Sequence, residues 1–353
     1  MLTTADPAEI PGLLRKTLGP RWNFTVDGTH LDVRHLDHGT PYRPPRHALP
    51  WPDLLALLES AFGDQGVPRA PCLPLRWGRE TELTISAIQA FDPVLKDGGT
   101  IPYRQGFIPQ PVVRLTAKRG ADGTLRDGFL TSFVNASRVE LLPDPTAYAT
   151  AFDQLLTVLS RLSLHARHIS FHGNLAIWRR RQVEGITLRF DHADLPLGDV
   201  VLLWNATHPD RLVLDLGTSL ERLAWTRSRD SWPTLIFGPL ADAAAYETLD
   251  ALRTATLLLA HGIAPSARGA GSITRRVLHS ISSDAFGLGL VGAVRQVHGY
   301  WRTASPLSVP WPQVAALMEA AVHEQESALG LGGLPRGERA CSAAPSSRPH
   351  LLR

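Results

Sequence analysis

The sequence predicts an α+β protein built on one curved antiparallel sheet. Six strand-like runs lie between residues 81 and 217: TELTISAI, QPVVRLTAK, GFLTSFVNASRVELL, GITLRFDHA, GDVVLLWNA and RLVLDLG. Few helical patterns interrupt them, and long strands that follow one another without intervening helices favour antiparallel pairing in an α+β domain. After residue 241 the pattern becomes helical, which predicts a separate α-helical part.

The composition indicates a globular chain. It has 353 residues, 44% of them hydrophobic, which is enough for a sizeable core. Apolar runs such as VVLLW at 200–204 are far shorter than the roughly 20 residues of a membrane span, and no signal-like segment opens the chain. We therefore expect a cytoplasmic protein without a membrane partner. The net charge of +3 would favour a nucleotide or nucleic-acid partner without identifying one.

Cysteine and histidine usage argues against a metal site. Cys72 and Cys341 are far apart and neither belongs to a CxxC pair, so neither a disulfide framework nor a zinc knuckle is expected. His165, His168 and His172 have a spacing that metal ligands can use, but no carboxylate or cysteine stands at a matching position.

Four segments are expected along the chain. Residues 1–50 hold an amphipathic stretch, an alternating run at 23–36 and a Pro-rich linker, which suggests a small appended element. Residues 51–238 form the main domain, with helices from Trp51 to about 62 and over 146–164. Residues 239–329 are helical, with patterns over 242–262, 273–285 and 311–329. Residues 330–353 are rich in Gly, Ser, Pro and Arg and are predicted to be disordered.

The segment DRLVLDLGTSLER, residues 210–222, has the pattern of a strand that runs into a helix. The strand presents Asp215, Gly217 keeps the backbone open, and Glu221 and Arg222 fall in the first turns of the helix. Free N–H groups at a helix start suit phosphate binding, and an arginine adds a bidentate cation. The spacing alone favours a structural turn with a surface Glu/Arg pair.

The same segment resembles the third signature motif of class II aminoacyl-tRNA synthetases of the alanyl type, whose strand ends in Asp-Thr-Gly-Met-Gly-Leu-Glu-Arg. The resemblance implies that Asp215 and Gly217 bind the amino acid, Asp215 through its α-ammonium, and that Glu221 and Arg222 bind ATP. Ser219 replaces the second glycine of the family motif.

Further resemblances to this family follow in order over residues 51–300. LLALLESAF and TELTISAIQAF resemble its first motif, and QPVVRLTAKRG resembles the strand of its second, which makes Arg114 a ligand of the α-phosphate. GFLTSFVNAS resembles the returning strand and implies that Phe133 and Asn135 contact ATP. Two departures stand here: the loop ADGTLRDG lacks the family's His-Asn-Asp, and Thr131 replaces a glutamate.

Two tryptophan-containing runs also match. NLAIWRRR implies that Trp178 lines the amino-acid pocket, and VVLLWNA implies that Asn205 clamps the ammonium together with Asp215. On residues alone, both tryptophans are more typical of a hydrophobic core or a half-buried position.

The run LDALRTATLLLAHGIAPSARGAGSITRRVL resembles the family's first helices after the catalytic domain, which meet the tRNA acceptor stem. Four arginines would then contact tRNA phosphates: Arg253, Arg268, Arg275 and Arg276. The alternative is a solvated basic helix face.

The resemblance implies that the chain activates a small amino acid, alanine or a similar one, with ATP and Mg²⁺ and transfers it to tRNA. Two other hypotheses stand: an adenylate-forming enzyme that passes the aminoacyl group to a carrier protein or a metabolite, and a non-catalytic paralogue that binds tRNA or an amino acid. Because the editing module has no counterpart in this sequence, no zinc site is expected. A monomer and a dimer both remain open.

Overall fold

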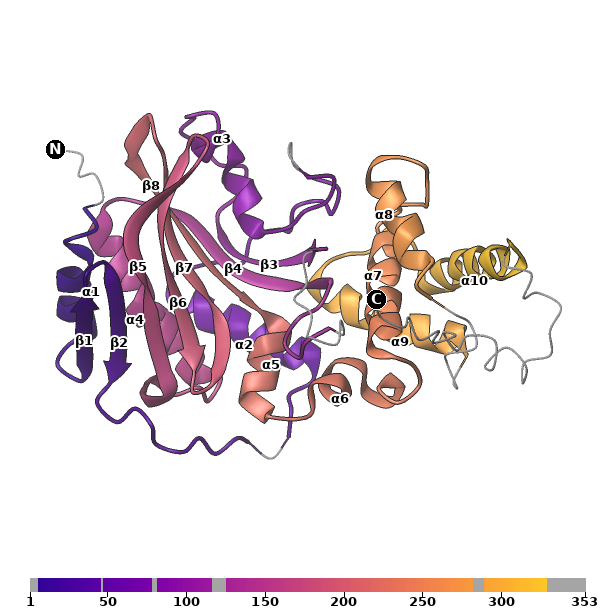
Figure 1. The fold of residues 1–353 in the computed structure, drawn as a ribbon, viewed down its shortest axis with the longest axis horizontal. Coiled ribbons are helices and arrows are strands. Elements are labelled where there is room, and N and C mark those ends of the chain that lie inside the picture. The colour runs from indigo at the N-terminus through magenta and orange to yellow at the C-terminus, as the bar shows by residue number, and fades with distance from the viewer. Residues whose placement is uncertain (1–5, 46, 78–80, 116–124, 282–288, 329–353) are drawn as a thin grey trace, which may run out of the picture. The chain divides into compact units, whose positions relative to one another are not determined.

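The structure is a computed structural model that describes residues 6–45, 47–77, 81–115, 125–281 and 289–328. The chain divides into two compact units (Figure 1). We call Met1–Gly238 with Gly299–Leu307 the sheet unit, and Pro239–His298 with Ser308–Arg353 the helical unit. The coarse prediction of an α+β fold on an antiparallel sheet is confirmed. The predicted disorder of residues 330–353 lies outside the described residues.

The described residues of the sheet unit form one eight-stranded sheet in the order β1-β2-β5-β6-β7-β8-β4-β3, and all neighbouring strands are antiparallel. The strands are β1 (Trp22–Asp27), β2 (His30–His35), β3 (Gly106–Val113), β4 (Ser132–Leu142), β5 (Ile169–Arg180), β6 (Val183–His192), β7 (Leu195–Asn205) and β8 (His208–Ser219).

The N-terminal hairpin extends the main sheet. Strands β1 and β2 form a hairpin whose turn contains Gly28 with a φ of 57°. Strand β2 then pairs with β5, so that Leu31 lies opposite Gly173 and Val33 opposite Phe171. The hairpin is therefore the edge of the main sheet.

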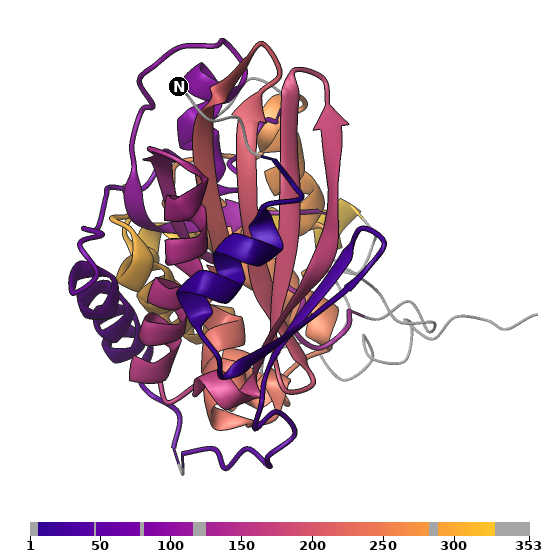
Figure 2. The same cartoon turned by 90° about the vertical axis from the view of Figure 1, so that its left-hand side faces the viewer.

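One face of the sheet, which we call the covered face, is packed against helices. Side chains alternate between the two faces along a strand, and Val200, Leu202, Leu214 and Leu216 are completely buried on this side. The Tyr148 hydroxyl of α4 (Pro145–Arg161) donates to the Val200 carbonyl at 3.0 Å. Helix α1 (Ile10–Leu18) packs along α4 across the same face (Figure 2), and α2 (Trp51–Gly63) also contacts α4.

The opposite face, which we call the open face, carries a hydrophobic cluster toward one end. There a short 3₁₀ turn, η1 (Ala87–Phe91), and α3 (Asp92–Leu95) pack on Leu203 and Val213 in a hydrophobic cluster. The prediction that TELTISAI is a strand is wrong. Its backbone bends instead, because Gln89 Oε1 accepts hydrogen bonds from the Ile85 and Ser86 amides at 2.7 and 3.3 Å.

Strand β5 was not predicted as a strand, although it lies at the centre of one half of the sheet. Its sequence ISFHGNLAIWRR places Gly173 and Asn174 in the middle, and its pairing with β6 shifts register between Asn174 and Trp178. A bulge of this kind interrupts the two-residue alternation on which strand prediction depends.

The remaining helices follow the last strand. In the sheet unit they are α5 (Leu220–Ser228) and α6 (Trp232–Phe237), and a 3₁₀ turn, η2 (Ala166–His168), precedes β5. The helical unit contains α7 (Tyr246–Ala260), α8 (Gly269–Leu278) and α10 (Trp311–Ala328); η3 (Gly238–Leu240) lies at the boundary, and α9 (Leu290–Ala304), which was not predicted, contributes residues to both units. Within the described ranges, no helix combines the length and apolarity that crossing a bilayer requires.

His192 makes the stability of the sheet unit dependent on pH. Its ring is fully buried, 4.5 Å from the Tyr42 ring, and its Nδ1 lies 3.3 Å from an Nη of Arg229. Burial, then Arg229 and His168, lower the pKa of His192 to about 3. Since the folded pKa lies below the unfolded value of about 6.5, we expect unfolding free energy to rise with pH between 3 and 6.5, by at most roughly 1.4 kcal/mol per pH unit.

Urea unfolding at pH 5 and pH 7 checks this expectation. His192→Gln should reduce the difference in unfolding free energy between pH 5 and pH 7. His47→Gln, which changes an exposed histidine, should leave this difference as in wild type. A His192→Gln protein with the wild-type pH dependence would contradict the assignment.

Candidate active site

A cavity of about 250 Å³ lies on the open face of the sheet, where β7, β8, β4 and the end of β3 meet the start of α5. Cross-strand pairing explains why these residues meet. On β8, Asp215 lies opposite Val201 of β7, and Gly217 lies opposite Asp199 of β7 and Ser137 of β4. The cavity brings together six of the residues predicted from sequence: Arg114, Phe133, Asn135, Asp215, Gly217 and Arg222.

Arg114 follows the last residue of β3. Its Nε donates to the Ile85 carbonyl at 2.6 Å, and its guanidinium lies 5.0 Å from the centre of the Phe133 ring. Burial lowers the pKa of Arg114, and Asp215 and Asp199 oppose that shift. The Ile85 carbonyl thus holds the Nε edge of the guanidinium, and the Phe133 ring holds one of its faces. Within the described residues, its Nη groups make no hydrogen bond.

Arg222, in the first turn of α5, is held in the same way. Its Nε donates to the Gly128 carbonyl at 2.9 Å, and its guanidinium lies 4.9 Å from the centre of the Phe129 ring. Its backbone N–H donates to Ser219 Oγ at 3.0 Å, so Ser219 caps the helix. That N–H is therefore not free for a phosphate, and the guanidinium is the cationic group that this helix start presents to the cavity.

Asp215 supplies a carboxylate whose Oδ1 atom is buried. Burial, with a smaller contribution from Asp199, raises the pKa of Asp215 to about 7, while Arg114 opposes the shift. Asp215 Oδ1 and Ser137 Oγ are both buried without a hydrogen-bond partner in the described structure. A side chain at Gly217 would point between them, with Cβ 3.5 Å from Ser137 Oγ and 4.0 Å from Asp215 Oδ1. Orphaned buried polar atoms around an open space are typical of a ligand site.

Asp199 lines the cavity and was missed from sequence. Burial raises the pKa of Asp199, and Arg189, Arg222 and Arg114 lower it. Its Oδ1 lies 3.7 Å from the Arg189 Nε. The Asp199 side chain is 53% exposed. The alternation Asp199, Val201, Leu203 places it on the face of the sheet opposite to that of Val200 and Leu202.

Asn135 and Phe133 line the cavity mainly as supports. Asn135 Oδ1 accepts from Ser86 Oγ and the Ala87 amide, both at 3.2 Å, and its Nδ2 donates to the Thr218 carbonyl at 3.1 Å. These bonds join η1 to the end of β8. Phe133 carries the Arg114 guanidinium on its ring face.

Glu221 does not face the cavity, which corrects its predicted contact with ATP. It is fully buried, and its carboxylate accepts from the Val134 amide at 3.1 Å and from the Tyr300 hydroxyl at 2.5 Å. Its role is structural: it ties α5 to β4 and to the segment Gly299–Leu307.

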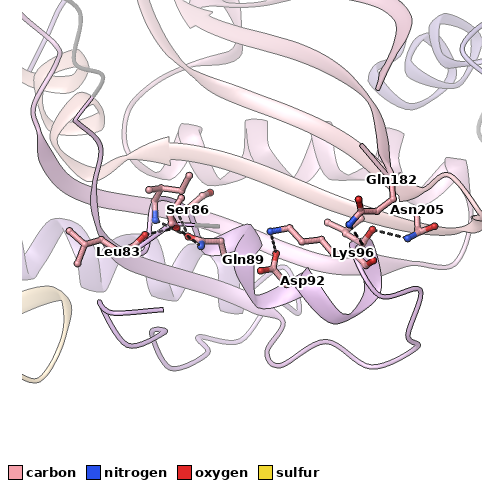
Figure 3. Close-up of polar contacts among 10 residues, drawn as sticks. Leu83, Ser86, Gln89, Asp92, Lys96, Gln182 and Asn205 are labelled. Atoms are coloured by element: carbon pink, nitrogen blue, oxygen red, sulfur yellow. Dashed lines mark hydrogen bonds and ion pairs between the residues drawn. The ribbon is translucent and has the colours of Figure 1, made fainter. Parts of the chain in front are cut away.

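Asn205 also lies away from the cavity, so the predicted clamp with Asp215 is wrong. It pairs with His208 beside the β7–β8 turn, four residues along β7 from the Val201–Asp215 pair, which is about 13 Å. Its Nδ2 donates to the Leu95 carbonyl at 2.9 Å. Figure 3 shows this bond beside that of Gln182 to the Lys96 carbonyl, at 3.3 Å, and the Asp92–Lys96 ion pair. Asn205 anchors the end of α3.

Trp178 is outside the cavity as well, which corrects its assignment to the amino-acid pocket. It lies on β5 opposite Gly185, and 36% of its surface is exposed. Another tryptophan, Trp232 of α6, is 2% exposed and forms part of the cavity wall. Nothing in the local sequence distinguished the two, since α6 reaches the cavity only through the packing of the chain.

The four arginines predicted to bind tRNA differ in accessibility. Arg253 is 2% exposed within α7, so a direct phosphate contact by Arg253 is contradicted. Arg268 caps the start of α8, and Arg275 and Arg276 occupy its last turn; all three are exposed. For these three, tRNA binding stays a prediction.

No family model matches this chain, and no curated protein matches it significantly. The relation to the synthetases therefore remains a resemblance carried by the quoted motifs.

The charged residues of the cavity are compatible with the phosphates of a nucleoside triphosphate. Two anchored guanidinium groups, those of Arg114 and Arg222, suit phosphate oxygens. Among the described residues, no group of three or more His, Cys, Asp or Glu side chains is placed to hold a metal ion. Mg²⁺ commonly binds through one or two carboxylates and the substrate's phosphates, and the cavity contains two carboxylates, those of Asp199 and Asp215.

Proposed function

We propose that the cavity activates a small amino acid with ATP, as in class II synthetases of the alanyl type, and that tRNA accepts the aminoacyl group. The observation that carries the proposal is the convergence of two anchored arginines and two carboxylates at the β8–α5 junction. The strand order β8-β4-β3 supports it, because this order brings Arg114 and Arg222 to one cavity from positions 108 residues apart in the sequence.

Each charged group has a role in this reaction. The α-ammonium of the amino acid binds between Asp215 and Asp199, which replaces the predicted pair of Asp215 and Asn205. A carboxylate oxygen of the amino acid then bonds to the α-phosphorus while the bond from that phosphorus to the bridging oxygen breaks, and pyrophosphate leaves. Arg114 and Arg222 stabilise the negative charge on the phosphates. The step needs no proton transfer, so positioning and charge carry the catalysis.

The proposal is tested by ATP–pyrophosphate exchange with each of the twenty amino acids. We expect exchange with alanine or a similar small amino acid, because the cavity is small and Trp232 closes part of it. Addition of total tRNA should then yield an acid-precipitable aminoacyl product. Exchange with no amino acid would refute adenylate formation. Exchange without transfer to tRNA would assign the acyl group to a carrier protein or a metabolite instead.

Amino-acid affinity should rise with pH through about 7. A ligand ammonium binds the ionised carboxylate, and the pKa of Asp215 in the free protein is raised to about 7 by burial. Affinity should fall by up to about tenfold per pH unit below that value. Calorimetric titration between pH 5.5 and 7.5 measures this slope. Asp215→Asn should bind weakly at every pH, and a wild-type slope in this variant would contradict the role of Asp215.

A further inference from the structure

A second groove, with a volume of about 470 Å³, lies on the open face over β5 and β6. His30, at the turn of the β1–β2 hairpin, borders it, so the N-terminal hairpin helps to build it. The side chains that form its surface are His30, His172, Asn174, Trp178, Thr187 and Arg189.

The groove and the cavity are neighbours on the sheet. Strand pairing aligns His172, Arg189, Asp199 and Gly217 in one row from β5 to β8. Neighbouring strands are about 4.8 Å apart, so Arg189 of the groove is one strand from Asp199 of the cavity. Arg189 and Asp199 are therefore the boundary between the two sites.

Trp178 provides a fixed aromatic surface in this groove. Its Nε1 donates to Thr187 Oγ1 at 3.0 Å. Its ring lies over Gly185, where a Cβ atom would come within 2.8 Å of the Trp178 Cζ2. The hydrogen bond to Thr187 thus fixes one edge of the indole, and one ring face packs on the Gly185 backbone. The residue is 36% exposed. A large aromatic ring held in this way is suited to stacking on a planar ligand.

The rest of the groove is suited to an anion. The Arg189 side chain is 70% exposed, and its ion pair with Asp199 is long, at 3.7 Å. His172 Nδ1 lies 3.6 Å from an Asp191 oxygen, and no residue that lines the groove is acidic. Arg189 stands two residues along β6 from Thr187, which is about 7 Å. A ribose can span this separation between a base and its 5′-phosphate.

We propose that this groove binds a nucleoside monophosphate, either free or as the terminal nucleotide of an RNA strand. The base stacks on Trp178 and the phosphate pairs with Arg189. The proposal does not depend on adenylate formation in the cavity, because the groove uses different residues. It assigns the N-terminal hairpin a function as one border of a nucleotide site.

The test follows the indole N–H signal of Trp178 by nuclear magnetic resonance, identified by its loss in Trp178→Phe. The probes are the four nucleoside 5′-monophosphates, a single-stranded CCA trinucleotide and inorganic phosphate. We expect a saturable shift of this signal with at least one nucleotide probe and a weaker effect of phosphate. Arg189→Gln should weaken binding at least tenfold, whereas Arg222→Gln, a change in the cavity, should leave it unchanged.

The outcomes separate the possibilities. A stronger response to the trinucleotide than to CMP or AMP indicates an RNA end, and equal responses indicate a free nucleotide; both support the site. No shift of the Trp178 signal with any nucleotide overturns the proposal. A shift that Arg222→Gln removes and Arg189→Gln preserves also overturns it, because the ligand would then be in the cavity. Thermal unfolding of each variant verifies that it is folded.

Discussion

Arg222→Gln is expected to lower the rate of ATP–pyrophosphate exchange by about 10²- to 10³-fold, the usual effect of removing one group that stabilises charge in a transition state. The guanidinium is anchored by the Gly128 carbonyl and the Phe129 ring, so it is already in position before ATP binds. Glutamine keeps polarity but removes the charge. Amino-acid binding should change little, because Asp215 is intact.

Two comparisons make this result specific. Arg161→Gln removes an exposed surface arginine of α4, whose ion pair with Asp64 is at 3.2 Å, and should leave exchange unchanged. Arg114→Gln should resemble Arg222→Gln, whereas Asp215→Asn should weaken amino-acid binding more than ATP use. If Arg222→Gln keeps the wild-type rate, or if all three variants lose both ligands equally, the assigned roles are wrong.

Glu221→Ala is expected to lower the free energy of unfolding by roughly 2–4 kcal/mol. The substitution removes the acceptor of the Val134 amide and of the Tyr300 hydroxyl in a fully buried place. Each buried polar group left without a partner costs about 1–3 kcal/mol. Urea unfolding followed by circular dichroism measures the change.

Two further variants, one milder and one at the surface, provide a comparison for this loss of unfolding free energy. Tyr300→Phe removes one hydrogen bond to a charged group and should cost roughly 1.5–3 kcal/mol. Glu9→Ala, at an exposed position before α1, should change stability by less than about 0.5 kcal/mol. A Glu221→Ala protein as stable as wild type would show that the carboxylate is not needed to join α5, β4 and Tyr300.

Local patterns predicted much of the fold correctly. The alternating runs became β4, β6, β7 and β8, and the amphipathic run at residues 51–62 became α2. The failures have local causes. Gln89 bonds to the backbone of residues 85 and 86 and bends a strand-like run, and the bulge near Asn174 hides β5.

The candidate site shows the same division. Asp215 and Arg222 could be named because one short strand-to-helix motif contains both, and Arg114 was named from the resemblance of QPVVRLTAKRG to a known family's motif. Asp199 and Trp232 line the cavity only because of strand pairing and helix packing. Glu221 and Asn205 do not line it, because hydrogen bonds to buried partners hold their side chains elsewhere.

The sequence by itself therefore determined the α+β class and most of the strands, since periodicity acts over a few neighbouring residues, and the resemblance to a known family named three charged residues of the cavity. Only the tertiary structure decided that Asp199 faces both arginines, that Trp178 belongs to a second groove and that Arg253 is buried. The physical reason is that these contacts depend on which strands pair and in which register, and pairing joins residues far apart in the chain.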